Sequence, residues 1–214
     1  NHPARRTAIT AGGAVVLVLA ASLGYAANAA EPSAAPAPPP RDAAVAVASD
    51  AALTALAARG RSRTTTSVVR IDRDSASAYS VLAVDSARGT ALTVTVDNGR
   101  ATSVVDLGPR PVPASDVEVA RVRELVLRDP EAAAAVGHQL RRAGSTADPA
   151  GLTFMVTPFQ PGNAPAARNR TDLAACSTHR CLRVAAKVPG TETWIDTRML
   201  VADLSASRLL RITM

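Results

Sequence analysis

The sequence predicts an α+β protein built from two halves in tandem, each a helix followed by antiparallel strands. An alanine-rich helical stretch at 42–59 precedes four short strand patterns, and helical stretches between 115 and 143 precede four more. Glycine and proline turns separate the strands. We place the signal peptide at 1–29, an Ala/Pro-rich linker at 30–42, the first half at 43–108 and the second half at 109–214.

The first thirty residues have the three parts of a signal peptide. Arg5 and Arg6 form a basic start, an apolar stretch follows at 11–21, and Ala27 and Ala29 supply the small side chains that signal peptidase reads. The paired arginines are compatible with the twin-arginine route, and the Sec route fits as well. We therefore expect a secreted or envelope-associated protein. The alternative is an uncleaved leader that anchors the chain in the membrane, although this stretch is short for a span.

Composition limits the classes of function. Hydrophobic residues make up 47% of the 214 positions, which is too many for a disordered chain. The formal net charge is +6, but the basic residues are scattered among acids, and Lys187 is the single lysine among 24 of them. Aromatic residues are only 2%, too few for the stacking platforms that bind nucleic acid. We expect no nucleic-acid partner.

In the first half, the helix over 42–59 ends at Gly60, and one signal fixes the strand pairing. Apolar and threonine residues alternate over 90–96, which is typical of a half-buried strand. Asn98-Gly99 then predicts a type I′ hairpin, because both turn residues need positive φ. The predicted strands are 68–71, 79–84, 90–96 and 101–107.

In the second half, two helices precede the strands. Ser115 and Glu118 form a capping box for a helix that runs to Arg128. Asp129 and Pro130 fit the N-cap and first-turn proline of a second helix, which ends at Gly144. The predicted strands are 152–157, 180–188, 194–204 and 208–213, with turns at 189–190 and 205–207.

Three segments of the second half carry a family resemblance. They are 124–144, Thr157–Gly162, and Val201–Ser205 together with Leu209–Ile212. They resemble the small N-terminal domains of copper amine oxidases, and secreted actinobacterial proteins of unknown function also look like this. The resemblance implies a cystatin-like fold, in which a sheet wraps on one helix, and an accessory role without chemistry.

The sequence departs from those oxidases where their chemistry resides. Their large catalytic domain has no counterpart, and neither Tyr25 nor Tyr79 follows the asparagine that their quinone cofactor requires. Their copper site takes three histidines, whereas a cleaved chain would keep His138 and His179. The resemblance therefore implies an accessory domain standing alone, and we expect neither an enzyme nor a cofactor.

Cys176, His179 and Cys181 form the one constellation of reactive side chains. Two cysteines in an exported protein most often pair, and this short loop would gain about 2 kcal/mol of stability from the bond. The alternative is a copper or other soft-metal site at Cys176, His179 and Cys181, completed by Met155 or Met199. That site requires reduced thiols.

These observations favour an exported, non-enzymatic binding or accessory protein. Its expected partner is an extracellular or envelope protein, bound through a sheet face or an edge strand. One alternative is a secreted inhibitor of an extracellular hydrolase, with 158–170 as the inhibitory loop, by analogy with the cystatin-like fold. The other is the copper or redox protein. The candidate binding residues are Phe159, Gln160 and Trp194, and core packing is the competing interpretation of Trp194.

Overall fold

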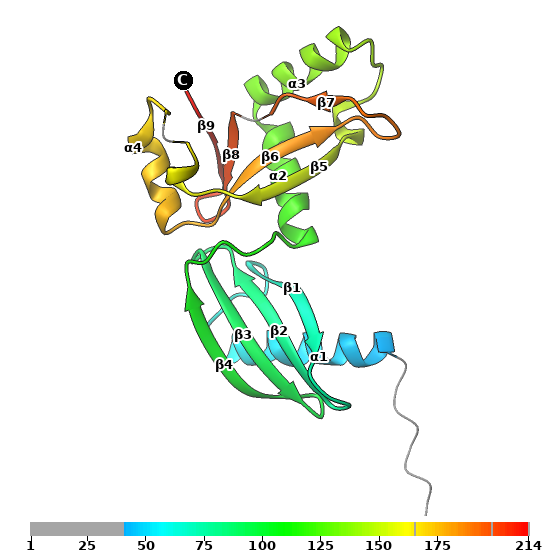
Figure 1. Ribbon diagram of the computed structural model, residues 1–214, viewed down its shortest axis with the longest axis vertical. Coiled ribbons are helices and arrows are strands. Elements are labelled where there is room, and N and C mark those ends of the chain that lie inside the picture. The colour runs from blue at the N-terminus through cyan, green and yellow to red at the C-terminus, as the bar shows by residue number, and fades with distance from the viewer. Residues whose placement is uncertain (1–40, 165, 198, 214) are drawn as a thin grey trace, which may run out of the picture. The chain divides into compact units, whose positions relative to one another are not determined.

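The computed structural model describes residues 41–164, 166–197 and 199–213 (Figure 1). Helices and two antiparallel sheets confirm the α+β class and the tandem arrangement. The predicted leader, with Arg5, Arg6, Ala27 and Ala29, lies outside the described residues, as does the linker up to residue 40. No helix in the described ranges is both long and apolar enough to cross a membrane.

The first half consists of α1 (Arg41–Ala58) and a four-stranded antiparallel meander. The turn residues Asn98 and Gly99 have φ values of 48° and 72°, so the predicted hairpin is confirmed. The strands are β1 (Thr66–Arg73), β2 (Ala78–Asp85), β3 (Thr90–Asp97) and β4 (Arg100–Gly108), paired in that order.

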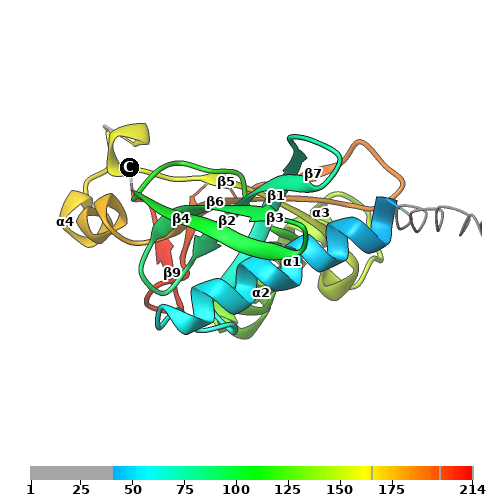
Figure 2. The same cartoon turned by 90° about the horizontal axis from the view of Figure 1, so that it is seen from below.

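One helix covers one face of this sheet (Figure 2). Ala48, Ala52 and Leu56 recur every four residues along α1, so they lie on one stripe, and all three are buried. They pack against the inward residues of the strands, including Val81 and Val94. Two of the three helix residues are alanine, which allows the helix to approach the sheet closely.

The helices of the second half are α2 (Asp116–Arg128) and α3 (Pro130–Arg142). Both ends of the predicted capping box are present, because the Ser115 hydroxyl accepts from Glu118 N–H while the Glu118 carboxylate accepts from Ser115 N–H. Asp129 caps α3 by accepting from Ala132 N–H at 2.8 Å.

The second sheet has the order β5-β6-β8-β9, with β7 also paired to β6. The prediction of one strand over 194–204 is wrong, because the chain leaves β6 after Ile195 and returns at Leu200. In the gap, the Thr197 hydroxyl donates to the carbonyl oxygen of Val184, a residue of β6 that neither β7 nor β8 pairs with. The strands are β5 (Thr153–Pro158), β6 (Cys181–Lys187), β7 (Trp194–Ile195), β8 (Leu200–Asp203) and β9 (Arg208–Arg211).

The two faces of the second sheet are covered differently. Its first face packs on α2 and α3 around a core that includes Val126, Leu182 and Val184. Part of its second face is covered by α4 (Arg170–Leu173) and the 3-10 turn Ala174–Ser177, which the sequence analysis did not predict. Further 3-10 turns lie at Pro149–Gly151 and Pro161–Asn163. The rest of the second face is left without this cover.

Candidate binding face of the second sheet

The uncovered part of the second sheet is centred on β6. Leu182, Val184 and Ala186 point into the helix-covered core, so the alternate residues of the strand point to the opposite face. Those alternate residues are Arg183, Ala185 and Lys187. They form a row with a cation at each end and a small side chain between them.

Two large apolar side chains flank this row. Met155 on β5 pairs directly with Ala185, and Trp194 on β7 pairs directly with Lys187, so both share the face of the row. Met155 is 50% exposed and Trp194 is 52% exposed. We call the set Met155, Arg183, Ala185, Lys187 and Trp194 the open face.

Lys187 is engaged by two neighbours. Its ammonium Nζ lies 2.9 Å from each carboxylate oxygen of Glu192, and 5.8 Å from the centroid of the Trp194 ring. The Glu192 side chain is 93% exposed, so this ion pair stabilises little and a partner could displace it. The cation–π contact orients the indole on the sheet.

Arg183 has fewer partners. Its guanidinium carbon lies 5.9 Å from the centroid of the Phe159 ring, and its Nε is buried without a hydrogen-bond partner. Within the described ranges it makes no hydrogen bond to an acceptor and no ion pair to a carboxylate. The two terminal nitrogens of a guanidinium carry four N–H donors besides the buried Nε–H, so this side chain is equipped to bind an acceptor brought by another molecule.

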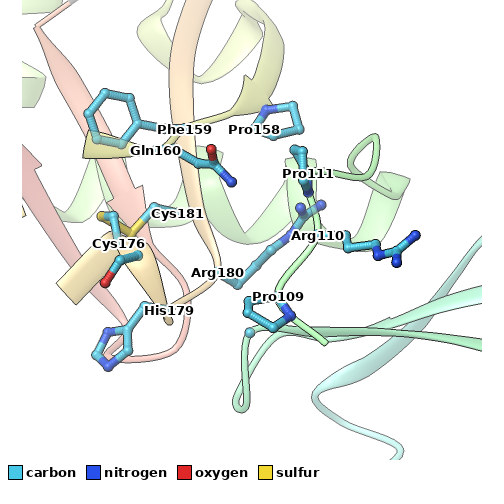
Figure 3. A pocket seen from close by; sticks show the side chains of 12 residues that line it. Pro109, Arg110, Pro111, Pro158, Phe159, Gln160, Cys176, His179, Arg180 and Cys181 are labelled. Atoms are coloured by element: carbon cyan, nitrogen blue, oxygen red, sulfur yellow. A yellow bond between two sulfur atoms is a disulfide. The ribbon is translucent and has the colours of Figure 1, made fainter. Parts of the chain in front are cut away.

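The structure places the three predicted binding residues in different surroundings. Trp194 lies on the open face, so the core-packing interpretation is wrong for its side chain. Phe159 is only 3% exposed and packs in the cluster with Leu173 and Val201, so its ring cannot meet a partner. Gln160 is exposed and lines a cavity of about 20 Å³ near Cys181 (Figure 3), with room for roughly one water molecule.

Sequence reasoning did not single out Arg183 or Lys187 as binding residues, and it considered Met155 only as a metal ligand. Apolar and other residues alternate along β6, which is enough to predict that Arg183, Ala185 and Lys187 share one face of the strand. Which face of the strand stays uncovered depends on where α4 and its neighbouring turn pack, and a four-residue helix leaves little trace in a sequence.

The predicted disulfide is confirmed. Cys176 and Cys181 are joined by a 2.03 Å S–S bond (Figure 3), so neither sulfur is a free thiolate that could bind a metal. His179 Nδ1 lies 3.0 Å from a carboxylate oxygen of the buried Asp203. Across the residues that the structure describes, no group of three or more His, Cys, Asp or Glu side chains could hold a metal ion.

The proposed inhibitory segment, 158–170, is folded onto the second half. Phe159, Ala164 and Ala167 are buried in one cluster, and Arg168 N–H donates to the carbonyl oxygen of Thr213 at 2.8 Å. A loop that binds a protease exposes the residues that make the contact. Burial of this segment against the second half therefore does not favour an inhibitory loop at 158–170.

No family model matches the chain, and no curated protein matches it. The likeness to amine oxidase accessory domains therefore remains a prediction, carried by the segments named above.

Proposed function

We propose that this chain is an exported, non-enzymatic binding or accessory protein that holds an extracellular or envelope protein through the open face. One observation carries the proposal. The only tryptophan of the chain and Met155 are both about half exposed on the same face of one sheet. Tryptophan, arginine and methionine are enriched at protein interfaces, and the first two at their energetic centres.

The rest of the described surface offers no similar pairing on one sheet face. The other large apolar side chains that are more than half exposed are Val47 on α1, Val105 on β4 and Val117 on α2. Each lies on a different element, and single exposed apolar residues are ordinary on soluble proteins. The open face therefore provides the best-supported contact surface.

The charges indicate what the partner supplies. Among the residues that the structure describes, Arg183 has no carboxylate partner, and the carboxylate that pairs with Lys187 is the exposed Glu192. A partner with a carboxylate beside an apolar side chain would pair with Arg183 while it covers Met155 and Trp194. Such pairing gives specificity and steering, while the apolar anchors provide most of the affinity.

Photo-crosslinking in the exporting host tests this proposal. Benzoylphenylalanine replaces Met155 in one variant and Val117 in a control variant, because both side chains are at least half exposed. We expect a discrete protein adduct from position 155 that is absent from position 117. The same adduct from both positions, or none from 155 under saturating light, would overturn the assignment of the open face.

The export part of the proposal has a separate test. Intact mass spectrometry of the exported protein should give a chain that starts at Ala30 and has no alkylatable thiol before reduction. A mass that retains Arg5 and Arg6 would indicate that the leader is uncleaved and anchors the protein in the membrane. The crosslinking experiment would then be carried out on isolated membranes.

A further inference from the structure

The disulfide closes a loop, residues 176–181, that contacts the first half directly. Gly89 lies in the turn between β2 and β3 at φ +64°, and a Cβ added there would lie 2.2 Å from the carbonyl oxygen of Thr178. The same Cβ would lie 2.9 Å from the carbonyl carbon of His179. Two backbones therefore meet here with no room for a side chain.

A hydrogen-bond relay joins the closed loop to the first half. Arg180 N–H donates to the Ser205 hydroxyl at 2.9 Å, and that hydroxyl donates to the carbonyl oxygen of Ser86 at 2.6 Å. Ser86 is 1% exposed and lies in the same β2–β3 turn as Gly89. The relay therefore depends on where the closed loop places the backbone of Arg180.

The side chain of Arg180 holds the connection between the halves. Its guanidinium donates to the carbonyl oxygens of Val112 and Pro113, each at 3.0 Å, and pairs with Glu118 at 2.8 Å. The Val112 side chain is buried against Val84 of the first half. Val112 is thus held by both halves, and Figure 3 shows Arg180 extending from the closed loop toward this connection.

Two side-chain hydrogen bonds between the halves do not depend on the closed loop. The Ser67 and Ser115 hydroxyls lie 2.7 Å apart, and the Arg121 guanidinium donates to the Ser86 hydroxyl at 2.9 Å. The two cores between each sheet and its helices contain no residue of the closed loop, whereas Cys176 and Cys181 are buried in the smaller cluster on the second face of the second sheet. Loss of the loop geometry should therefore loosen that cluster and the contact between the halves, and leave both helix-covered cores folded.

We propose that formation of the Cys176–Cys181 disulfide is the step that docks the two halves. The two thiols lose two protons and two electrons as the S–S bond forms, and a disulfide oxidant takes up both and is reduced to a dithiol. In the reverse direction, dithiothreitol opens the bond and becomes a cyclic disulfide. The reduced chain then keeps two folded halves joined by a mobile connection.

Trypsin measures docking at the contact itself. The Arg88–Gly89 bond lies at the loop contact, whereas the Arg142–Ala143 bond at the end of α3 is remote from it. We expect reduction by dithiothreitol, and the Cys176→Ser/Cys181→Ser variant, to raise cleavage after Arg88 about tenfold or more. Cleavage after Arg142 and the far-UV circular dichroism should stay unchanged.

A steric variant tests the same joint with the disulfide intact. Gly89→Ala places a methyl group against Thr178 and should expose the Arg88 bond to trypsin as reduction does. Gly190→Ala is the matched control, because Gly190 has φ +70° and nothing within 4 Å of an added Cβ. The proposal is overturned if reduction leaves the Arg88 rate unchanged while Gly89→Ala raises it. It is equally overturned if reduction accelerates cleavage at both arginines, which would indicate general unfolding.

Discussion

The two halves cover their sheets in the same way but leave different chemistry exposed. One helix covers one face of the first sheet and two helices cover one face of the second, and in each half a small apolar cluster covers part of the other face. The far face of the first sheet shows paired polar residues such as Ser80 with Thr95, whereas the second shows Met155 and Trp194. The arrangement of helices on a sheet is therefore not enough to make a binding surface. The side chains on the uncovered strands decide whether the face can bind a partner.

The cores differ as well. α1 contributes two alanines and a leucine at its buried positions, which suits a thin layer of small side chains. The second half buries the Arg180–Glu118 pair, whose side chains are 5% and 2% exposed. The most deeply buried ion pair described in the first half is Arg61–Asp85, whose side chains are 12% and 2% exposed. Removing one charge of the buried pair in the second half should therefore lower the free energy of unfolding more than the same change in the first half.

The largest expected effect is that of Glu118→Ala. The change leaves the Arg180 guanidinium buried without its carboxylate, so it should lower the free energy of unfolding by about 3–5 kcal/mol. Urea unfolding measures this loss. The double variant Glu118→Leu/Arg180→Met should lie within about 2 kcal/mol of wild type, because no charge is left unpaired. Equal losses in the single and double variants would show that packing matters here and that charge pairing does not.

Ala52→Leu should rank second. Ala52 is fully buried between α1 and the sheet, so a larger side chain should push the helix away and cost about 1–3 kcal/mol. Ala57→Leu on the exposed side of the same helix is the control and should change stability by less than about 0.5 kcal/mol. Tolerance of leucine at position 52 would mean that the first core is loosely packed.

Ser115→Ala should have a smaller effect. It removes the N-cap of α2 and the hydrogen bond to Ser67, with an expected loss of about 1–2 kcal/mol in thermal or urea unfolding. Ser67→Ala keeps the cap and should cost about 1 kcal/mol. If the two variants lose the same amount, the cap contributes nothing beyond the contact between the halves.

The smallest effect on stability should come from the open face. Met155→Ala and Trp194→Ala should each lower the free energy of unfolding by about 1 kcal/mol, because about half of each side chain is already exposed in the folded protein. Each change should nevertheless weaken partner capture, measured with the crosslinker moved to Ala185. Thr93→Ala, on the far face of the first sheet, should leave capture unchanged. If Thr93→Ala weakens partner capture and Trp194→Ala does not, the binding surface lies on the first sheet and not on the second.

Local signals in the sequence were enough for most of the elements. The Asn98-Gly99 turn, the Ser115 capping box and the strand alternation act over a few residues, and the structure confirms each of them. The break in the strand at 194–204 and the cover by α4 arise from contacts between distant segments. The same limit applies to the open face, because exposure of Trp194 is a property of its neighbours in space.

The single lysine of the chain gives the open face a practical property. An amine-reactive fluorophore has one ε-amine to modify, Lys187, and that amine lies beside Trp194. A dye placed there would report occupancy through changes in its emission, without any engineered cysteine that could disturb the disulfide. Amine coupling to a sensor chip would have the opposite result for every molecule attached through Lys187 rather than through its α-amine, since tethering at Lys187 would hide the surface under study.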